Sequence, residues 1–209
     1  MYRERYDMYE HFFKRIIDCI LSVLGLVVLS PLFLVIALAI KLDDHGPVFH
    51  KQRRVGTHKT YFNLYKFRSM KVGTPEVATH LLKHPKRYSS RVGGFLRTFG
   101  LDELPQLVNI LTGEMSIIGP RPALWNQDDL VAERDKYGAN DIRPGLTGWA
   151  QINGRDLLGI EEKAKLDGEY VTKMSFWFDV KCFFGTIVSV LKREGLPEES
   201  DEDDANDQQ

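Results

Sequence analysis

The longest hydrophobic run in the chain covers residues 16–40, in which Asp18 is the one charged residue. The uncharged part, from Cys19 to Ile40, corresponds to about 33 Å of straight helix, which is enough to cross a bilayer. The run is long for a signal peptide and ends without a small-residue cleavage signal. We therefore expect a membrane helix over residues 16–41, preceded by a polar segment at residues 1–15.

Ser30 and Pro31 interrupt this helix near its middle. Proline removes a helical hydrogen bond and clashes with the preceding turn, so the helix should break there. The Ser30 hydroxyl can then bond a carbonyl that the break leaves free. Lysine and arginine residues flank both ends of the run, and basic flanks prefer the cytoplasmic side. These features favour a re-entrant helix, which enters the membrane, turns and returns, over a kinked single span.

The rest of the chain mixes short strand patterns with helical ones. Residues 48–55 and 61–70 predict a β-hairpin, with aromatic residues at every second position of its second strand, and residues 115–118 predict a short buried strand. Helices are expected over residues 123–142, 161–173 and 176–191. The last has a broad aromatic stripe, for which core packing is the default and the membrane interface the alternative. The predicted fold class is α+β: a small, mostly helical domain with a short β-hairpin, anchored by a re-entrant membrane hairpin and interfacial amphipathic helices.

Another helix is expected to begin at Asp102 or Glu103, because Pro105 is tolerated only in the first turn of a helix. Gly113 is placed to end it in the left-handed conformation. Its hydrophobic positions recur at helical spacing and should form a buried stripe: Leu104, Leu107, Val108 and Leu111.

Charge is distributed unevenly along the chain. It has 28 basic and 29 acidic residues, but seven of the acidic ones lie in residues 198–209, so residues 196–209 are expected to be a disordered acidic tail. The remainder, with its main domain at residues 42–195, has a net charge of about +6 and suits an anionic partner: a phosphate-bearing substrate, an anionic membrane or a nucleic acid. Cys19 and Cys182 match no metal or disulfide spacing and should be buried in a reducing compartment.

Asp102 and Glu103 are the main candidates for chemistry. At a helix N-terminus, Asp102 would lie beside unpaired backbone N–H groups, where an ionised carboxylate is favoured and phosphate is attracted. A carboxylate can attack phosphorus and form an acyl phosphate, while its neighbour Glu103 could hold Mg²⁺ or handle a proton. The plainer interpretation makes Asp102 a helix cap and Glu103 a first-turn charge.

Basic residues near this pair are candidates for phosphate binding. Arg121 stands between Pro120 and Pro122, which stiffen the backbone on both sides, as suits a pre-placed bidentate donor. Arg97 precedes Asp102 by five residues. The glycine-rich segment 142–155 is either a backbone nest for phosphate or a series of structural turns. The basic residues of the hairpin either form a solvated face or contact phosphate or lipid headgroups.

Five of these motifs, in this order, resemble those of the bacterial sugar transferase family, the monotopic polyprenyl-phosphate phosphoglycosyl transferases. They are the run broken at Ser30-Pro31, Tyr65–Met70, Leu101–Gln106, Gly119–Pro122, and Arg143–Gly145 with Asn153–Arg155. The resemblance covers residues 11–195 and is to the minimal form, because the additional N-terminal membrane domain of longer members is absent. Gly100 departs from the small polar residue that many members have there, and residues 72–92 and the acidic tail match no motif of the family.

The resemblance implies an enzyme that transfers sugar 1-phosphate from a UDP-sugar to polyprenyl phosphate, usually undecaprenyl phosphate, and releases UMP. This would be the first membrane step of capsule, exopolysaccharide, O-antigen or glycoprotein glycan assembly, at the cytoplasmic face of the bacterial plasma (inner) membrane. Asp102 would form a covalent aspartyl-phosphosugar intermediate and Glu103 would assist, with Mg²⁺ as cofactor and both acids as its ligands. The phosphate-binding residues implied are Arg97, Arg121, Arg155, Lys66, Arg68 and Arg143.

Other classes of protein explain parts of the pattern. A membrane adaptor would use Asp102 only as a cap. A nucleic-acid binder rests on the aromatic and basic hairpin alone, without a recognition motif, so no nucleic-acid partner is expected. A glycosyltransferase that makes a glycosidic bond directly would release UDP instead of UMP. The amphipathic helix at residues 176–191 could serve a homodimer as easily as a membrane.

Overall fold

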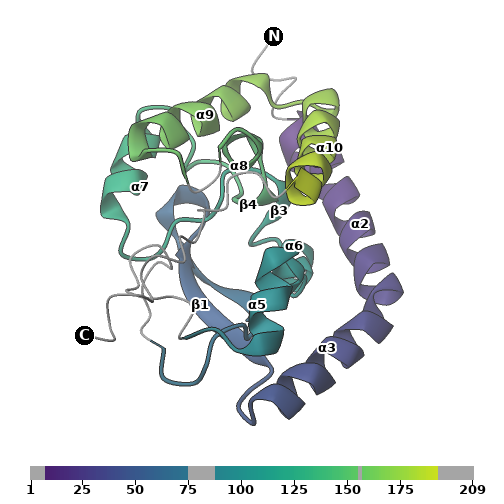
Figure 1. The fold of residues 1–209 in the computed structure, drawn as a ribbon. Helices are drawn as coiled ribbons and strands as arrows, with labels where there is room; N and C mark the ends of the chain where they lie inside the picture. Colours follow the sequence, from purple (N-terminus) through teal and green to yellow (C-terminus); the bar gives the residue numbers. More distant parts are fainter. Residues whose placement is uncertain (1–7, 75–87, 155–156, 193–209) are drawn as a thin grey trace, which may run out of the picture.

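The computed structural model describes residues 8–74, 88–154 and 157–192 (Figure 1). Two helices in series run along one edge: α2 (Lys14–Val28), which continues a π-helical turn η1 (Tyr9–Phe13), and α3 (Ser30–Asp43). The first helical stretch, Tyr9–Val28, is bent by 60° against the second. No described helix is by itself long and apolar enough to cross a membrane, whereas this bent pair passes the same test of length and composition.

The break falls where the sequence predicts it. Pro31 lies in the first turn of α3, and Ser30 Oγ donates a hydrogen bond of 2.8 Å to the carbonyl oxygen of Val27. In an unbroken helix that carbonyl would accept from the backbone N–H of residue 31, which proline lacks. The serine hydroxyl therefore replaces the missing donor, as expected.

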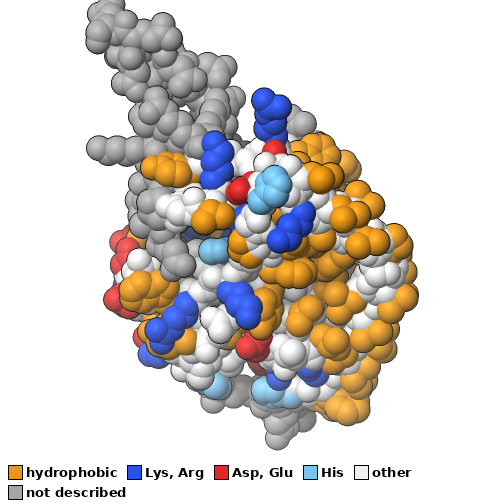
Figure 2. Space-filling model, turned by 90° about the horizontal axis from the view of Figure 1, so that it is seen from below, with side chains coloured by type: hydrophobic (Ala, Val, Ile, Leu, Met, Phe, Trp, Pro, Cys, Tyr) orange, Lys and Arg blue, Asp and Glu red, His pale blue; other side chains and the backbone are white. Residues whose placement is uncertain are grey.

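α2 turns its polar side towards the protein. Its three buried residues, Lys14, Asp18 and Ser22, follow one another at one-turn intervals. The side chains that it exposes are hydrophobic: Ile16, Ile20, Leu21, Val23, Leu24, Val27 and Val28. α3 likewise exposes Leu34, Val35, Leu38 and Leu42. Figure 2 shows hydrophobic side chains gathered on this side of the molecule. Such a surface is matched to an apolar environment and not to water.

The predicted hairpin forms from β1 (Phe49–Val55) and β2 (Tyr61–Phe67), which pair antiparallel and are joined by the 3₁₀ turn η2 (Thr57–Lys59). β2 alternates as expected, but its buried positions include Phe62 and Leu64, while Tyr61 is 52% exposed. The aromatic residue at position 61 thus lies on the solvent face, where the Arg53 guanidinium stacks 4.1 Å from its ring centroid.

A second, parallel sheet pairs β3 (Ser116–Ile118) with β4 (Gly145–Thr147), a strand that the sequence did not predict. Its glycines allow close backbone approach: a Cβ at Gly145 would lie 2.1 Å from the backbone nitrogen of Gly119. The N–H groups of Gly119 and Gly145 donate to the carbonyls of Thr147 and Pro120, both at 2.8 Å. These N–H groups are therefore used within the protein, which favours structural turns over a phosphate nest in this part of segment 142–155.

The remaining helices surround these sheets (Figure 1). They are α5 (Arg91–Thr98), the 3₁₀ turn η4 (Leu101–Glu103), α6 (Gln106–Thr112), α7 (Asp128–Asp135), α8 (Trp149–Ile152), α9 (Ile160–Lys173) and α10 (Phe176–Lys192). The helix predicted over residues 123–142 is confined to α7, whereas α9 and α10 match their predictions closely. A core cluster joins Leu107 and Ile110 of α6 to β2 on one side and to Leu26 of α2 and Leu29, which follows α2, on the other. α6 therefore lies between α2 and the hairpin.

The expectation that the aromatic stripe of α10 packs in the core is wrong. Its buried residues are Asp179, Cys182 and Ser189. Its hydrophobic stripe is exposed instead: Phe176, Trp177, Phe183, Phe184, Ile187, Val188 and Leu191. The helix packs through a narrow polar side and presents its aromatic side outwards, the arrangement of the interfacial alternative. The expected burial of the cysteines holds for Cys182, while Cys19 is only half-buried.

Candidate active site

Asp102 and Glu103 lie in a tight turn and not in an α-helix. They belong to η4, and α6 begins only at Gln106, so the predicted helix start is wrong by about one turn. The N–H groups of Glu103 and Leu104 bond the carbonyls three residues back, on Gly100 and Leu101, and Pro105 has no N–H to offer. Asp102 caps neither element, so the interpretation of this residue as a helix cap is also wrong.

Gly100 makes this turn possible. Its φ of +66° lies in the left-handed region that favours glycine, and it directs the chain from α5 into η4. At the other end of α6, Gly113 has a φ of +92°, which confirms the predicted left-handed end.

α6 buries a face different from the predicted stripe. Gln106, Leu107, Asn109 and Ile110 are buried. Val108 and Leu111 are 38% and 37% exposed. The helix starts later than predicted, and a different set of its residues faces inwards. Among them, the polar Asn109 side chain bonds the backbone of β2. Its amide donates to the Asn63 carbonyl at 2.8 Å and accepts from the Tyr65 N–H at 3.0 Å, which fixes α6 against β2.

Glu103 is fully engaged by two cations. Arg121 donates to its two carboxylate oxygens at 2.5 and 3.2 Å, and Lys66 Nζ donates at 2.8 Å. Burial alone would raise the pKa of Glu103, but the charges of Arg121 and Lys66 outweigh it and hold that pKa well below its usual value. Glu103 is therefore a carboxylate at neutral pH whose lone pairs already face donors.

Asp102, next in the chain, has the opposite environment. It is only 6% exposed, yet no other residue in the described part of the chain donates a hydrogen bond to its side chain. Burial raises its pKa and the Glu103 charge adds to this, while Lys66, Arg97 and Arg121 act against it. The turn thus holds one carboxylate paired with two cations and one carboxylate that has cations around it but no hydrogen-bond donor within residues 8–74, 88–154 and 157–192.

The loop that carries Arg121 is fastened to β1. Arg54 donates from its guanidinium to the Pro122 carbonyl at 2.9 Å, and the Val55 N–H donates to the Ala123 carbonyl at 2.9 Å. Burial and the charge of Arg121 lower the pKa of Arg54 to about 9, so it remains protonated at neutral pH. The sequence pattern marks Arg54 only as one of the basic residues of the hairpin, with no individual role. Its position opposite Phe62, on the inward face of the hairpin, is the signal that could have found it.

The other predicted phosphate-binding residues are dispersed. Arg97 lies in the last turn of α5 and its charge acts on Asp102. Arg68 is buried, donates to the Asp44 carbonyl and lies 3.5 Å from the Asp44 carboxylate, at the end of α3. This contact fastens α3 to the hairpin, while Arg68 Nη1 is buried without a hydrogen-bond partner among the described residues, so the expected phosphate contact of Arg68 stays a prediction. Arg155 lies outside the described residues.

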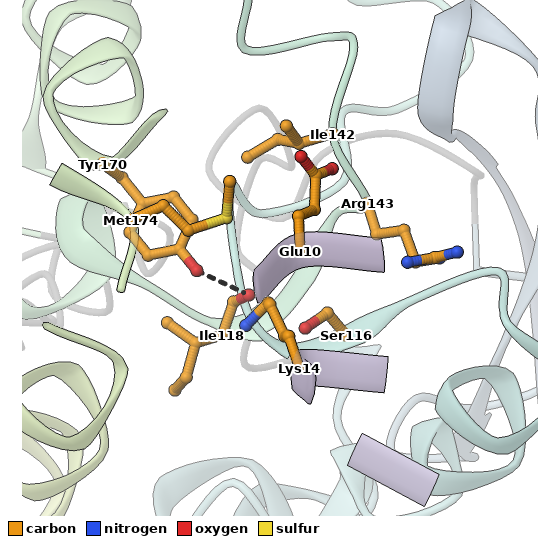
Figure 3. A pocket seen from close by; sticks show the side chains of 8 residues that line it. All are labelled: Glu10, Lys14, Ser116, Ile118, Ile142, Arg143, Tyr170 and Met174. Carbon is orange, nitrogen blue, oxygen red and sulfur yellow. Dashed lines mark hydrogen bonds between the residues drawn. The ribbon is translucent and has the colours of Figure 1, made fainter. Parts of the chain in front are cut away.

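Arg143 borders a small cavity with room for roughly one water molecule. Figure 3 shows it there with Glu10, Lys14 and Tyr170, whose hydroxyl donates to the Ile118 carbonyl at 3.2 Å. None of the residues around Asp102 lines this cavity. The backbone of Arg143 lies against Gly119 at the start of the Arg121 loop, and its expected phosphate contact stays a prediction.

The donors do not fit a metal site made by the protein alone. Within residues 8–74, 88–154 and 157–192, no three histidine, cysteine or acidic side chains converge on a point where a metal ion could lie. Glu103 already faces Arg121 and Lys66. Mg²⁺ commonly binds through one or two carboxylates together with substrate phosphates, so the expectation of Mg²⁺ at Asp102 and Glu103 stays a prediction.

Comparison with known proteins was made on the whole chain. The family model described as bacterial sugar transferase matches residues 9–193. The "UDP-glucose:undecaprenyl-phosphate glucose-1-phosphate transferase" of Escherichia coli is 41% identical over 188 residues, which are 83% of this chain and 39% of that protein. The "Undecaprenyl-phosphate galactose phosphotransferase" of Salmonella typhimurium is 34% identical over 200 residues, 88% of this chain and 41% of that protein.

A shorter relative matches along most of its own length. The "Uncharacterized sugar transferase EpsL" of Bacillus subtilis is 38% identical over 183 residues, 88% of this chain and 89% of that protein. This chain thus spans about two fifths of the Escherichia coli and Salmonella relatives and nearly all of the Bacillus one. The match extends from η1 to the end of α10 and includes every element of the candidate site. The chain belongs to the bacterial sugar transferase family.

Proposed function

We propose that this chain is a phosphoglycosyl transferase that moves sugar 1-phosphate from a UDP-sugar to a polyprenyl phosphate, undecaprenyl phosphate in particular. The Escherichia coli and Salmonella relatives, whose names describe undecaprenyl-phosphate transferases, support this reaction class. The observation that carries the assignment of Asp102 is its environment. It is a buried carboxylate to which no described residue donates a hydrogen bond, it lies beside Glu103, which is paired with Arg121 and Lys66, and the charges of Lys66, Arg97 and Arg121 act on it.

The chemistry follows in two displacements at phosphorus. One Asp102 carboxylate oxygen attacks the phosphorus that bears the sugar, and the bond to the bridging oxygen breaks so that UMP leaves with the electron pair. A phosphate oxygen of polyprenyl phosphate then attacks the same phosphorus, which frees the Asp102 carboxylate and forms the polyprenyl-diphosphate sugar. Such a covalent route lets two bulky substrates use one site in turn.

The cations around Asp102 supply what phosphoryl transfer needs most, which is positioning and charge neutralisation. Glu103 holds Arg121 and Lys66 in place, so its described contacts suit an orienting role better than that of a base. Arg54 holds the Arg121 loop from the other side. Any Mg²⁺ would add further neutralisation on the diphosphate, with Asp102 and Glu103 as the protein ligands expected from the family resemblance.

The test uses the purified full chain in nanodiscs that contain undecaprenyl phosphate, with Mg²⁺ present and a panel of UDP-sugars. We expect UMP to be released and, when the acceptor is left out, a phosphosugar adduct to be found on the peptide that contains Asp102. Release of UDP would identify a direct glycosyltransferase instead. Absence of any nucleotide release with every sugar tested would favour the adaptor.

We also propose that α2 and α3 form a re-entrant element in the cytoplasmic leaflet of the bacterial plasma membrane. Both ends of the bent pair are fastened to the same domain: Lys14 pairs with Asp179 at 2.5 Å, and Asp43 accepts from the Val92 N–H at 3.0 Å. One domain cannot lie on both sides of a membrane, so this geometry suits entry and return on one side. The exposed aromatic stripe of α10 would lie in the same interface.

Topology is tested by cysteine labelling at residues 5 and 45 in intact and permeabilised cells. Both positions should report the cytoplasm. Labelling from opposite sides would contradict the re-entrant arrangement, and Pro31→Ala should move the outcome towards a full span because it restores the helical hydrogen bond.

A further inference from the structure

α2 contacts the helix that follows Asp102. Arg15 donates from its two terminal guanidinium nitrogens to the carbonyls of Ile110 and Leu111, at 2.5 and 2.7 Å. These carbonyls belong to the last turn of α6, where backbone acceptors lack helical donors and where a cation is favoured by the helix dipole. Arg15 therefore fixes the far end of α6 relative to the membrane helix.

One turn further along, α2 contacts the strand that leads to Arg121. The Asp18 carboxylate accepts from the Ser116 hydroxyl at 2.7 Å and from the Ile117 N–H at 3.1 Å. Asp18 is 3% exposed. Because β3 ends at Ile118 and the chain runs directly from there into the Gly119–Pro122 loop, Asp18 fixes the base of the loop that carries Arg121.

The contacts of Arg15 with α6 and of Asp18 with β3 together bear on one distance, the separation of Asp102 from Arg121. Asp102 lies just before α6 and Arg121 just after β3. Among the described residues, the hydrogen bonds that tie Arg121 to the turn of Asp102 are those to Glu103, the next residue in the chain. Apolar contacts alone would also hold α2 against the domain, but they are non-directional. Charged groups on this helix give directional bonds, at the expense of placing ions on a membrane-facing element.

We propose that Arg15 and Asp18 are positioning residues, which hold α6 and β3 at the separation where Asp102 and Arg121 act on one substrate diphosphate. This rests on the proposed transfer reaction. The membrane helix is then part of the active-site framework and more than an anchor. A displacement of about 1 Å between a nucleophile and its phosphate-binding partner can lower a rate by about 100-fold, so small shifts of α2 should be visible in the chemical step.

The experiment measures the single-turnover rate of adduct formation on Asp102, with the full chain in nanodiscs and labelled UDP-sugar. Arg15→Met removes both donors and keeps a long apolar stem, Asp18→Leu removes the acceptor, and Arg15→Lys keeps the charge with a single donor group. Tyr9→Phe is the matched control, because it deletes a hydrogen bond of 2.8 Å from the same N-terminal helical stretch to Asp179 and keeps the bonds from α2 to α6 and β3.

We expect Arg15→Met and Asp18→Leu to lower the single-turnover rate about tenfold or more, with a change of donor KM below about threefold. Arg15→Lys should recover part of the rate, and Tyr9→Phe should stay within about twofold of the wild type. Vesicle flotation and the thermal midpoint measure membrane binding and folding in the same samples.

An unchanged rate per folded Arg15→Met enzyme, with only a lower thermal midpoint, would overturn the proposal and leave a merely structural contact. If the larger changes prevent folding, Ser116→Ala removes one bond from the β3 side, and a wild-type rate in that variant would count against the proposal equally. A wild-type enzyme that forms no adduct on Asp102 would instead refute the proposed function itself.

Discussion

The molecule contains two clusters of buried charge that differ in one respect. Around Asp179, every acceptor is paired: Tyr9 and Lys14 donate to one oxygen at 2.8 and 2.5 Å, and Tyr170 donates to the other at 2.7 Å. Around Asp102 and Glu103, the second acid is paired in the same way, but the first has no donor among the described residues.

The difference is that between a structural cluster and a cluster that can still accept a ligand, which fits the proposed role of Asp102. A closed cluster of buried ions has no capacity left for a substrate, and its removal leaves uncompensated charge. An incomplete cluster keeps a carboxylate with a raised pKa and an excess of cations, which is the pattern found where phosphate groups are bound and transferred. The Asp179 cluster joins the N-terminal helix to α9 and α10, whereas the Asp102 cluster joins the turn, the hairpin and the Arg121 loop.

Asp102→Asn should have the largest effect on catalysis. The amide keeps the size of the side chain and loses its nucleophilicity, so UMP release should fall by at least about 1,000-fold. The chain should still fold, because the Asp102 side chain accepts no hydrogen bond from a described residue that the change would break. Asp128→Asn, an exposed acid in the first turn of α7, serves as the matched control and should keep full activity.

Asp179→Ala should have the largest effect on stability. It leaves the Lys14 ammonium buried without its counter-charge, and breaking such a pair costs about 3–5 kcal/mol. Thermal unfolding in detergent should show a clearly lower midpoint, and the activity per folded molecule below it should fall far less than in Asp102→Asn. Asp141→Ala, which breaks the solvent-facing pair with His58, should leave the midpoint nearly unchanged. If folded Asp179→Ala lost as much activity per molecule as Asp102→Asn, the proposed difference between the two clusters would be wrong.

Glu103→Gln should shift the pH dependence of the reaction. The Glu103 charge contributes to the raised pKa of Asp102, so its removal, which also leaves Lys66 and Arg121 uncompensated, should lower that pKa. Asp102 must be ionised to attack, and the acidic limb of the rate profile should therefore move to lower pH, together with a reduced maximal rate. A limb that stays in place would show that another group controls it.

The smallest expected effect concerns stability near neutral pH. Because burial makes the pKa of Asp102 higher in the folded than in the unfolded chain, its ionisation favours unfolding. The protonated Asp102 side chain therefore adds to the free energy of unfolding. This contribution is fully present below the unfolded-state pKa and is lost as the pH rises through the folded-state pKa. Asp102→Asn removes this loss, so its thermal midpoint should exceed that of the wild type slightly at pH 8, and the gain should vanish below about pH 4.

Local backbone chemistry could be predicted from the sequence. Pro31 lacks an N–H and Ser30 can replace it, Gly113 accepts a positive φ, and the two hairpin strands follow the period of a half-buried sheet. Each of these signals acts within a few residues. The two adjacent acids, and the arginine between two prolines, could be identified for the same reason.

Contacts between distant elements could not be predicted in this way. Whether Asp102 capped a helix depended on Pro105 and Gly100 together, and the outcome was a 3₁₀ turn. The pairing of Glu103 with Arg121 and Lys66 depends on how α6 is fixed to β2 through Asn109. The aromatic stripe of α10 faces outwards because the other side of that helix packs on the domain. The helical period of the sequence is the same whether the stripe faces inwards or outwards, so it could not decide between them.

The inward polar side of α2 has a consequence for biosynthesis. Lys14 meets Asp179, a residue 165 positions later, and Asp18 meets a strand almost a hundred positions later. A nascent helix that entered lipid by itself would expose both ions there, at a cost of about 2.5–3.5 kcal/mol each. On the proposed re-entrant arrangement, α2 finds these counterparts only after nearly the whole polypeptide has been made. We therefore expect the protein to reach the bilayer after translation, as an assembled unit.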